Sequence, residues 1–176
     1  MIFLGVAAFL LFILGDINDA YIKKRALKPC FTVGLLLLAA ATVCRMDMSH
    51  AKVIWFVFAA VFLAYLLKSL FGSFSNSEAY ADEPESRDVV DTGLYALCRH
   101  PGVLFFGGLY LCLHFGINLP WTDTIVYIVL NVILATLEDR FFFPEFLEGY
   151  DKYREKVPFL LPTKESVRNS LNKNGK

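Results

Sequence analysis

The sequence lacks the motifs of the common nucleotide-binding folds. It contains no glycine-rich phosphate loop, no Walker motif and no Rossmann unit, and its polar stretches are too short to build one. Cysteine is sparse, and the four cysteines have neither Cys-x-x-Cys spacing nor a histidine at metal-ligand spacing: Cys30, Cys44, Cys98 and Cys112. We therefore expect no metal site, and we expect helix ends and polar segments to hold any cofactor.

Apolar residues are abundant instead. The 176 residues are 56% hydrophobic and 15% aromatic, a composition too apolar for an ordinary soluble domain. The sequence predicts a single all-α membrane domain, residues 1–176, with about five transmembrane helices: Met1 to Leu14, Phe31 to Val43, Val53 to Phe71, Gly102 to Leu119 and Trp121 to Leu137. The first helix has no basic residues before it and no cleavage site after it, which favours an uncleaved span over a signal peptide.

Basic residues are distributed unevenly among the segments between these helices. With five spans, 15 of the 17 Lys and Arg residues fall on one side: Lys23, Lys24, Arg25, Lys28, Lys68, Arg87, Arg99, Arg140, Lys152, Arg154, Lys156, Lys164, Arg168, Lys173 and Lys176. This bias predicts an N-terminus outside and a C-terminus in the cytoplasm. The polar loop over residues 72–92 is then cytoplasmic, and its length favours a lid.

An ionisable cluster precedes the fourth apolar segment. Arg99, His100 and Pro101 stand at its start, and charged side chains at membrane depth indicate a functional site. An arginine that extends to the lipid headgroups is the structural alternative. The tight turn after this segment predicts that the fourth and fifth helices are antiparallel neighbours, which brings Glu138 and Asp139 toward Arg99 and His100.

Further polar residues lie within or beside the apolar segments. His114 and Asn131 are inside the fourth and fifth segments, where a hydrogen bond within the bundle is the favoured role and a place on a cavity wall is the alternative. Asp16, Asn18 and Asp19 follow the first segment, where a solvated last turn is favoured over a cation site.

The C-terminal region predicts an amphipathic helix after a restart at Pro144. Its apolar residues recur at helical spacing: Phe142, Phe146, Tyr150, Tyr153 and Val157. We expect this helix to lie on the membrane or to fold back over the helix ends. Residues 163–176 form a polar, basic tail that we expect to be loose.

Two of these motifs together resemble a known family. Gly93-x-Tyr95-x-x-x-Arg99-His100-Pro101 is followed, across the hairpin, by Glu138-Asp139 and by Tyr150-x-x-Tyr153-x-x-x-Val157-Pro158. In this order they resemble the C-terminal half of the isoprenylcysteine carboxyl methyltransferase and phospholipid methyltransferase superfamily. The likeness covers residues 91–162, and the first three helices agree with it only in hydropathy.

The resemblance implies an integral membrane methyltransferase that binds S-adenosylmethionine through residues 93–162. It places these residues at the cofactor: Tyr95, Arg99, His100, Pro101, Gly107, Glu138, Asp139, Tyr150 and Tyr153. His100 and Glu138 are the first candidates to take a proton from a thiol or amine nucleophile. Thr136 stands where prenylcysteine enzymes of the family carry an arginine, which argues against that substrate more than against methyl transfer.

Methyl transfer to a lipid-phase or small hydrophobic substrate is the leading hypothesis. The methylated group is a prenylcysteine carboxylate, a phospholipid amine or a thiol, and no catalytic triad is expected because the sulfonium donor is already activated. The alternatives are a membrane reductase that uses a nicotinamide cofactor and a non-catalytic binding or transport protein on the same scaffold. We expect the bilayer and a lipid-like molecule as partners, and no nucleic acid.

Overall fold

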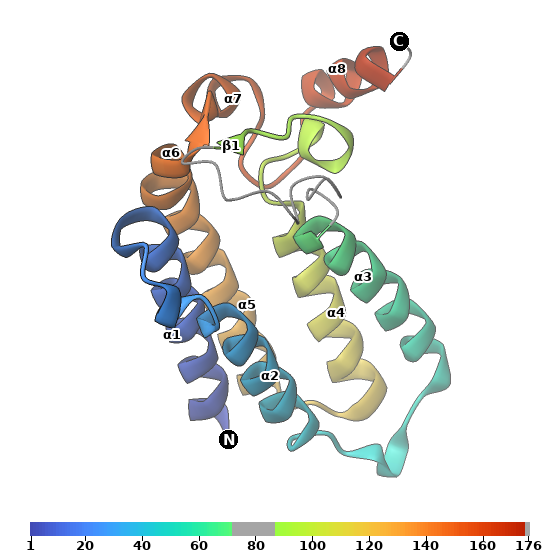
Figure 1. The fold of residues 1–176 in the computed structure, drawn as a ribbon. Helices are drawn as coiled ribbons and strands as arrows, with labels where there is room; N and C mark the ends of the chain where they lie inside the picture. Colours follow the sequence, from blue (N-terminus) through green and yellow to red (C-terminus); the bar gives the residue numbers. More distant parts are fainter. Residues whose placement is uncertain (72–86, 175–176) are drawn as a thin grey trace.

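The computed structural model describes residues 1–71 and 87–174, which form a helical bundle with a smaller cap at one end (Figure 1). The cap consists of residues 87–98 and 147–174. The main helices are α1 (Ile2–Ile17), α2 (Cys30–Val43), α3 (Val53–Phe71), α4 (Pro101–Ile117) and α5 (Trp121–Leu137). Short helical turns join or extend them: η1 (Asn18–Ile22), η2 (Arg25–Leu27), η3 (Met48–His50), η4 (Gly93–Ala96) and η5 (Glu138–Phe142). The remaining elements are β1 (Arg87–Asp88), α6 (Phe143–Phe146), β2 (Leu147–Glu148), α7 (Tyr150–Lys156) and α8 (Lys164–Asn174).

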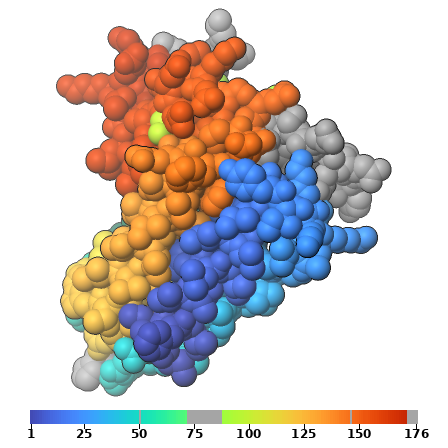
Figure 2. Space-filling model, turned by 90° about the vertical axis from the view of Figure 1, so that its left-hand side faces the viewer, coloured from blue at the N-terminus to red at the C-terminus, as the bar shows by residue number. Residues whose placement is uncertain are grey.

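The bundle consists of two helix pairs joined by α5. Helix α1 packs along α2 and α3 packs along α4, while α5 contacts both α1 and α4. Figure 2 shows α1 and α5 side by side on one face, with the C-terminal segment at the end of the bundle. The predicted hairpin is confirmed: α4 ends at Ile117, Asn118 turns the chain with a φ of 49°, and Pro120 precedes α5.

The centre of the bundle is aromatic. Phe9 of α1, Phe106 of α4 and Tyr127 of α5 are almost fully buried, and the ring centroids of Phe9 and Phe106 lie 6.0 Å apart. A side chain at Gly5 would collide with the ring of Tyr127, so this glycine permits the close approach of α1 and α5. Contact of this kind stabilises helices in lipid, where apolar burial alone gives little preference for association.

Within residues 1–71 and 87–174, three helical stretches are long and apolar enough to cross a membrane: Ile2–Ile22, Arg25–Val43 and Val53–Phe71. Helices α4 and α5 have 17 residues each. At about 1.5 Å per residue each rises about 25 Å, which is less than the roughly 30 Å of hydrocarbon in a bilayer. Large apolar side chains are exposed along α3, among them Val53, Ile54, Val57 and Val61. A surface of this kind is compatible with contact to lipid.

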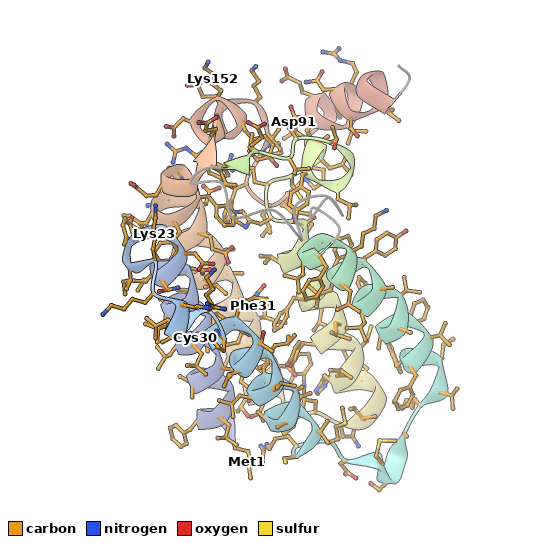
Figure 3. All side chains as sticks on the ribbon, viewed as in Figure 1. Met1, Lys23, Cys30, Phe31, Asp91 and Lys152 are labelled. Carbon is orange, nitrogen blue, oxygen red and sulfur yellow. The ribbon has the colours of Figure 1, made fainter. Side chains whose placement is uncertain are left out.

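The two ends of the bundle differ in their side chains. Figure 3 shows Lys23 and Lys152 toward the end that carries the cap, and Met1 at the opposite end. At the opposite end Arg45 forms an ion pair with the buried Asp123, with 2.8 Å between Nε and Oδ2.

Of the predicted loop over residues 72–92, residues 72–86 lie outside the described residues, and the remainder contains β1.

The expected amphipathic helix from Phe142 to Val157 is wrong as one continuous element. The chain becomes extended at Leu147, where β2 pairs in parallel with β1. Gly149 then takes a φ of 77°, a left-handed conformation that glycine adopts without steric cost, and α7 begins after it. Helix α7 folds back over this end of the bundle, where Tyr150 and Tyr153 are buried. Tyr150 donates to Asp139 in η5, and Tyr153 donates to the Tyr95 carbonyl in η4.

The polar tail over residues 163–176 contains α8, which the sequence prediction missed. Thr163 and Ser166 exchange hydrogen bonds at its start: the Ser166 amide donates to Thr163 Oγ1 over 3.1 Å, and the Thr163 amide donates to Ser166 Oγ over 3.0 Å. This reciprocal pair is arranged as in a capping box, which satisfies backbone donors at a helix start. The Thr163-Lys164-Glu165-Ser166 sequence is therefore a local helix signal in a segment of low hydropathy.

Candidate functional site

Asp139 is the centre of a buried hydrogen-bond cluster at the ends of α4 and α5. Arg99 donates to both of its oxygens, from Nε over 2.7 Å and from Nη2 over 3.0 Å. The Tyr150 hydroxyl donates over 2.6 Å, and His100 Nε2 lies 3.3 Å from the same carboxylate. Burial alone would raise the pKa of Asp139, but the hydrogen bonds from His100, Arg99 and Tyr150 and the charge of Arg99 hold that pKa well below its usual range.

The same arginine fastens the cap to the bundle. Its Nη1 donates to the carbonyls of Arg154 and Val157 in and after α7. The backbone amide of Arg99 donates to the Pro158 carbonyl over 2.9 Å, and the next amide donates to the Phe159 carbonyl over 3.1 Å. Arg99 therefore binds Asp139 and the chain after α7 at once, and its side chain is only 10% exposed.

The two tyrosines of the C-terminal motif serve this cap. Tyr150 reaches Asp139, and the Tyr153 hydroxyl donates to the carbonyl of Tyr95 over 2.7 Å. Tyr95 in turn donates from its hydroxyl to the carbonyl of Ser69 at the end of α3. Burial raises the pKa of both Tyr150 and Tyr153, so their hydroxyls stay protonated and act as donors.

His100 and Glu138 form a second pair beside the first. His100 Nδ1 lies 3.6 Å from Glu138 Oε2, and the imidazole stacks on Phe143 with 5.7 Å between centroids and 7° between planes. The ring of Phe159 lies on a further side of the imidazole, with centroids 5.1 Å apart. Burial, together with the neighbouring charges of Asp16 and Asp139, raises the pKa of Glu138 to about 8. A carboxyl with such a pKa can exchange a proton near neutral pH.

The backbone at η5 separates the two adjacent carboxyls. Residues Glu138–Phe142 form a π-helical turn, which is rare and often found at functional sites. Glu138 lines the interior of the bundle, whereas Asp139 is directed to Arg99 and the cap. Arg140, the next residue, is exposed.

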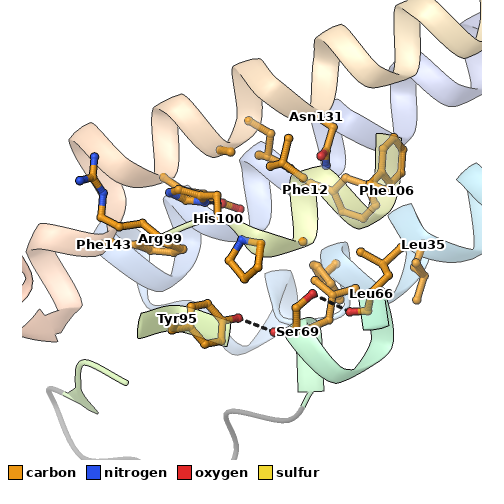
Figure 4. Close-up of a pocket in the computed structure, with 18 of the residues that line it drawn as sticks. Phe12, Leu35, Leu66, Ser69, Tyr95, Arg99, His100, Phe106, Asn131 and Phe143 are labelled. Atoms are coloured by element: carbon orange, nitrogen blue, oxygen red, sulfur yellow. Dashed lines mark hydrogen bonds and ion pairs between the residues drawn. The ribbon is translucent and has the colours of Figure 1, made fainter. Parts of the chain in front are cut away.

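A cavity of about 270 Å³ lies between the helices next to Glu138 (Figure 4). Its walls are mainly apolar and come from all five main helices; the lining residues include Phe12, Phe31, Leu35, Leu38, Leu66, Phe106 and Leu134. Figure 4 shows Arg99, His100 and Phe143 toward one end, and Phe12, Phe106 and Asn131 toward the other. Phe31 and Leu35 of α2 are 37% and 36% exposed, so this wall reaches the outer surface of the bundle.

The sequence-predicted residues divide into three groups by position. Five of them line the cavity: Tyr95, Arg99, His100, Pro101 and Glu138. Three others form hydrogen bonds that attach the cap beside the cavity: Asp139, Tyr150 and Tyr153. Gly107 is not among the lining residues, and a methyl group added to it would meet no atom within 4 Å in the described part of the chain. Of the two roles considered for Asn131 and His114, Asn131 has a place on the cavity wall. His114 has a hydrogen bond within the bundle, because its Nδ1 lies 2.7 Å from the Leu119 carbonyl.

The sequence analysis did not predict several residues of the site. Phe143 and Phe159 flank His100, yet in the sequence they are ordinary apolar residues. The cavity walls from α1, α2 and α3 were not predicted either, because hydropathy does not indicate which face of a helix meets a cavity. Within residues 1–71 and 87–174, no group of three His, Cys, Asp or Glu side chains could hold a metal ion.

Comparison of the chain with models of protein families, with curated proteins and with solved structures finds no match.

Proposed function

We propose that this protein is an integral membrane methyltransferase that uses S-adenosylmethionine and acts on a lipid-phase substrate. One observation carries the proposal: an apolar cavity that reaches the bundle surface through α2 has His100 and Glu138 at its polar end. An amphipathic molecule would enter its apolar part from the lipid. Its polar group would then meet the imidazole and the carboxyl.

The residues at this end fit the chemistry of the cofactor. The Glu138 carboxyl suits an amine or ribose hydroxyls, and the rings of Tyr95 and Phe143 offer faces for an adenine or a sulfonium. Arg99 already holds Asp139 and two carbonyls, so a bond from Arg99 to the cofactor carboxylate would form in addition to these bonds or in exchange for one. The volume of the cavity is just below the roughly 300–1,000 Å³ that is typical of small-molecule sites. The bound molecules would therefore extend beyond it toward the cap.

The cofactor supplies an activated methyl group, and the chain's own residues bind, orient and exclude water. His100 or Glu138 would accept the proton of a thiol or amine nucleophile, and a pKa of about 8 suits Glu138 for this exchange. The cap held by Arg99 and Tyr150 would keep water from the reacting groups.

The proposal includes the five-span topology, with the cap in the cytoplasm and the N-terminus outside. The 15-to-2 distribution of basic residues supports this orientation. Helices α4 and α5 are short for spans, but α4 packs against the 19-residue α3, and α5 packs against α1 of the 21-residue stretch Ile2–Ile22. The aromatic Trp121 at the outer end of α5 suits the membrane interface.

Calorimetric titration of the purified full chain tests the cofactor assignment. We expect S-adenosylmethionine to bind and reduced nicotinamide nucleotides not to bind. His100→Ala and Glu138→Gln should each weaken binding by about tenfold, which is the effect of losing one hydrogen bond to a charged group. Asp151→Asn changes a carboxylate that is 74% exposed and should leave affinity unchanged. Tight nicotinamide binding without S-adenosylmethionine binding would favour a reductase instead.

A non-catalytic lipid-binding protein is the second candidate. The observation in its favour is that Arg99 and Asp139 satisfy each other within the chain, which is how a purely structural pair behaves. This candidate predicts binding of amphiphiles without binding of either cofactor, so the same titration separates it from the proposal.

A further inference from the structure

Asn131 presents an unpaired polar atom inside the bundle. Its Oδ1 is buried and has no hydrogen-bond partner within the described part of the chain. Figure 4 shows the side chain extending from α5 into the space that Phe12 and Phe106 also line. Buried polar groups in native proteins nearly always have a partner, so a lone amide on a cavity wall points to a molecule that occupies the cavity.

Four residues of α5 line the same cavity with helical spacing: Asn131, Leu134, Ala135 and Glu138. Positions i, i+3, i+4 and i+7 lie on one face of a helix, so these side chains form a single strip. The rise from Asn131 to Glu138 is about 10 Å at 1.5 Å per residue. The strip is therefore polar at both ends and apolar between them.

We propose that the cavity takes an aliphatic amphiphile with two polar groups: a reacting group at Glu138 and His100, and a hydroxyl at Asn131 about 10 Å away. The inference rests on the proposed function only in naming the Glu138 end as the reacting end. A hydroxyl both donates and accepts, so it can pair with the oxygen or with the nitrogen of the amide. Asn131 is then a specificity residue that selects hydroxylated chains over plain ones.

Two probes of equal chain length test the inference: octylamine, and 8-amino-1-octanol, which adds a terminal hydroxyl. The amine of each suits the Glu138 carboxyl. Binding of both is measured by calorimetry on the full chain in detergent, for the wild type, Asn131→Leu and Thr136→Val. The ratio of the two affinities is compared between proteins, because partition into micelles and desolvation of the hydroxyl then cancel.

Thr136→Val is the matched control. Thr136 is on the same helix but not among the cavity-lining residues, and its hydroxyl donates to the Val132 carbonyl over 2.8 Å. We expect the affinity ratio to favour the hydroxylated probe about fivefold more in the wild type than in Asn131→Leu, the worth of one neutral hydrogen bond. Thr136→Val should keep the wild-type ratio. Equal ratios in the wild type and Asn131→Leu, or a ratio lost in Thr136→Val as well, would overturn the inference.

Thermal unfolding of the ligand-free proteins gives an independent measurement. Asn131→Leu keeps the size of the side chain and removes an unpaired group, so it should unfold at a temperature no lower than the wild type. A lower temperature would assign Asn131 a structural bond and overturn the inference. Absence of S-adenosylmethionine binding would remove the proposed function without touching either result.

Discussion

Replacement of Asp139 by Asn should loosen the cap while leaving the bundle folded. The carboxylate is 8% exposed and accepts two bonds from Arg99, whose side chain is 10% exposed. Removing one partner of a buried ion pair costs about 3–5 kcal/mol. Arg99 keeps the carbonyls of Arg154 and Val157 as acceptors, so we expect the lower end, about 3 kcal/mol.

Hydrogen exchange of the backbone amides of α7, followed by mass spectrometry in detergent, measures this change. If α7 opens locally, about 3 kcal/mol corresponds to an increase of about 100-fold in its opening constant, with little change in the exchange of α4. Asp151→Asn is the matched control, because Asp151 pairs with Arg154 at 3.2 Å with both side chains exposed. A surface pair of this kind contributes about 0.5 kcal/mol or less.

The same experiment has a defined pH dependence. The lowered pKa of Asp139 means that its contribution to stability is fully present above the ordinary aspartate pKa of about 3.9 and is lost only as pH falls through the lowered value. The contribution of Asp139 to the protection of the α7 amides from hydrogen exchange, corrected for the intrinsic exchange rate, should therefore be constant between pH 5 and 8. Wild-type protection of α7 in Asp139→Asn, or an equal loss in Asp151→Asn, would refute the role of this carboxylate.

Three further predictions concern the neighbouring residues and the topology. Burial and the charges of Asp16 and Asp139 raise the pKa of Glu138 to about 8, so the folded state holds this proton more tightly than the unfolded state and stability falls as pH rises from the ordinary glutamate pKa to 8. Thermal scans should show stability falling between pH 5 and 8 in the wild type and in Arg140→Gln, with a smaller fall in Glu138→Gln. Identical slopes in the three proteins would place Glu138 in solvent. Tyr150→Phe removes one bond to a charged group and should cost about 1.5–3 kcal/mol in α7 protection by exchange; no loss would show that the bond contributes nothing to the cap. In intact cells with the other cysteines replaced, an impermeant maleimide should label the exposed Cys44 and should not label a cysteine substituted for Asp151, and the reverse pattern would invert the topology.

The main helices could be predicted from the sequence because each apolar run is bounded by polar residues, Gly or Pro. The predicted segments Val53 to Phe71 and Trp121 to Leu137 coincide with α3 and α5. The bounds of α1 were short by a turn, since the polar Asp16 continues the helix rather than ending it. The C-terminal region was harder, because an i, i+3, i+4 pattern is blind to a left-handed glycine such as Gly149, whose conformation depends on its place in the fold.

The candidate site was predictable in its location and less so in its pairing. The hairpin brought Arg99 and His100 to the acidic pair, as its short turn predicts. Which carboxyl met which base depended on the π-helical turn, and the sequence carries no local signal for it. The walls from α1 and α2 were beyond prediction because an evenly apolar helix gives no direction to its faces.

The π-helical turn also bears on where this chain can change its length. In such a turn each hydrogen bond closes over one residue more than in an α-helix, so η5 contains a surplus residue relative to its axial distance. Removal of the exposed Arg140 would let the turn close as ordinary α-helix and leave Phe143 and the cap facing as before. Removal of a residue within α5, such as Ile128, would instead turn everything after it by about 100°. A deletion that α5 could not tolerate is thus absorbed one turn later, between the residues that face the cavity and those that carry the cap.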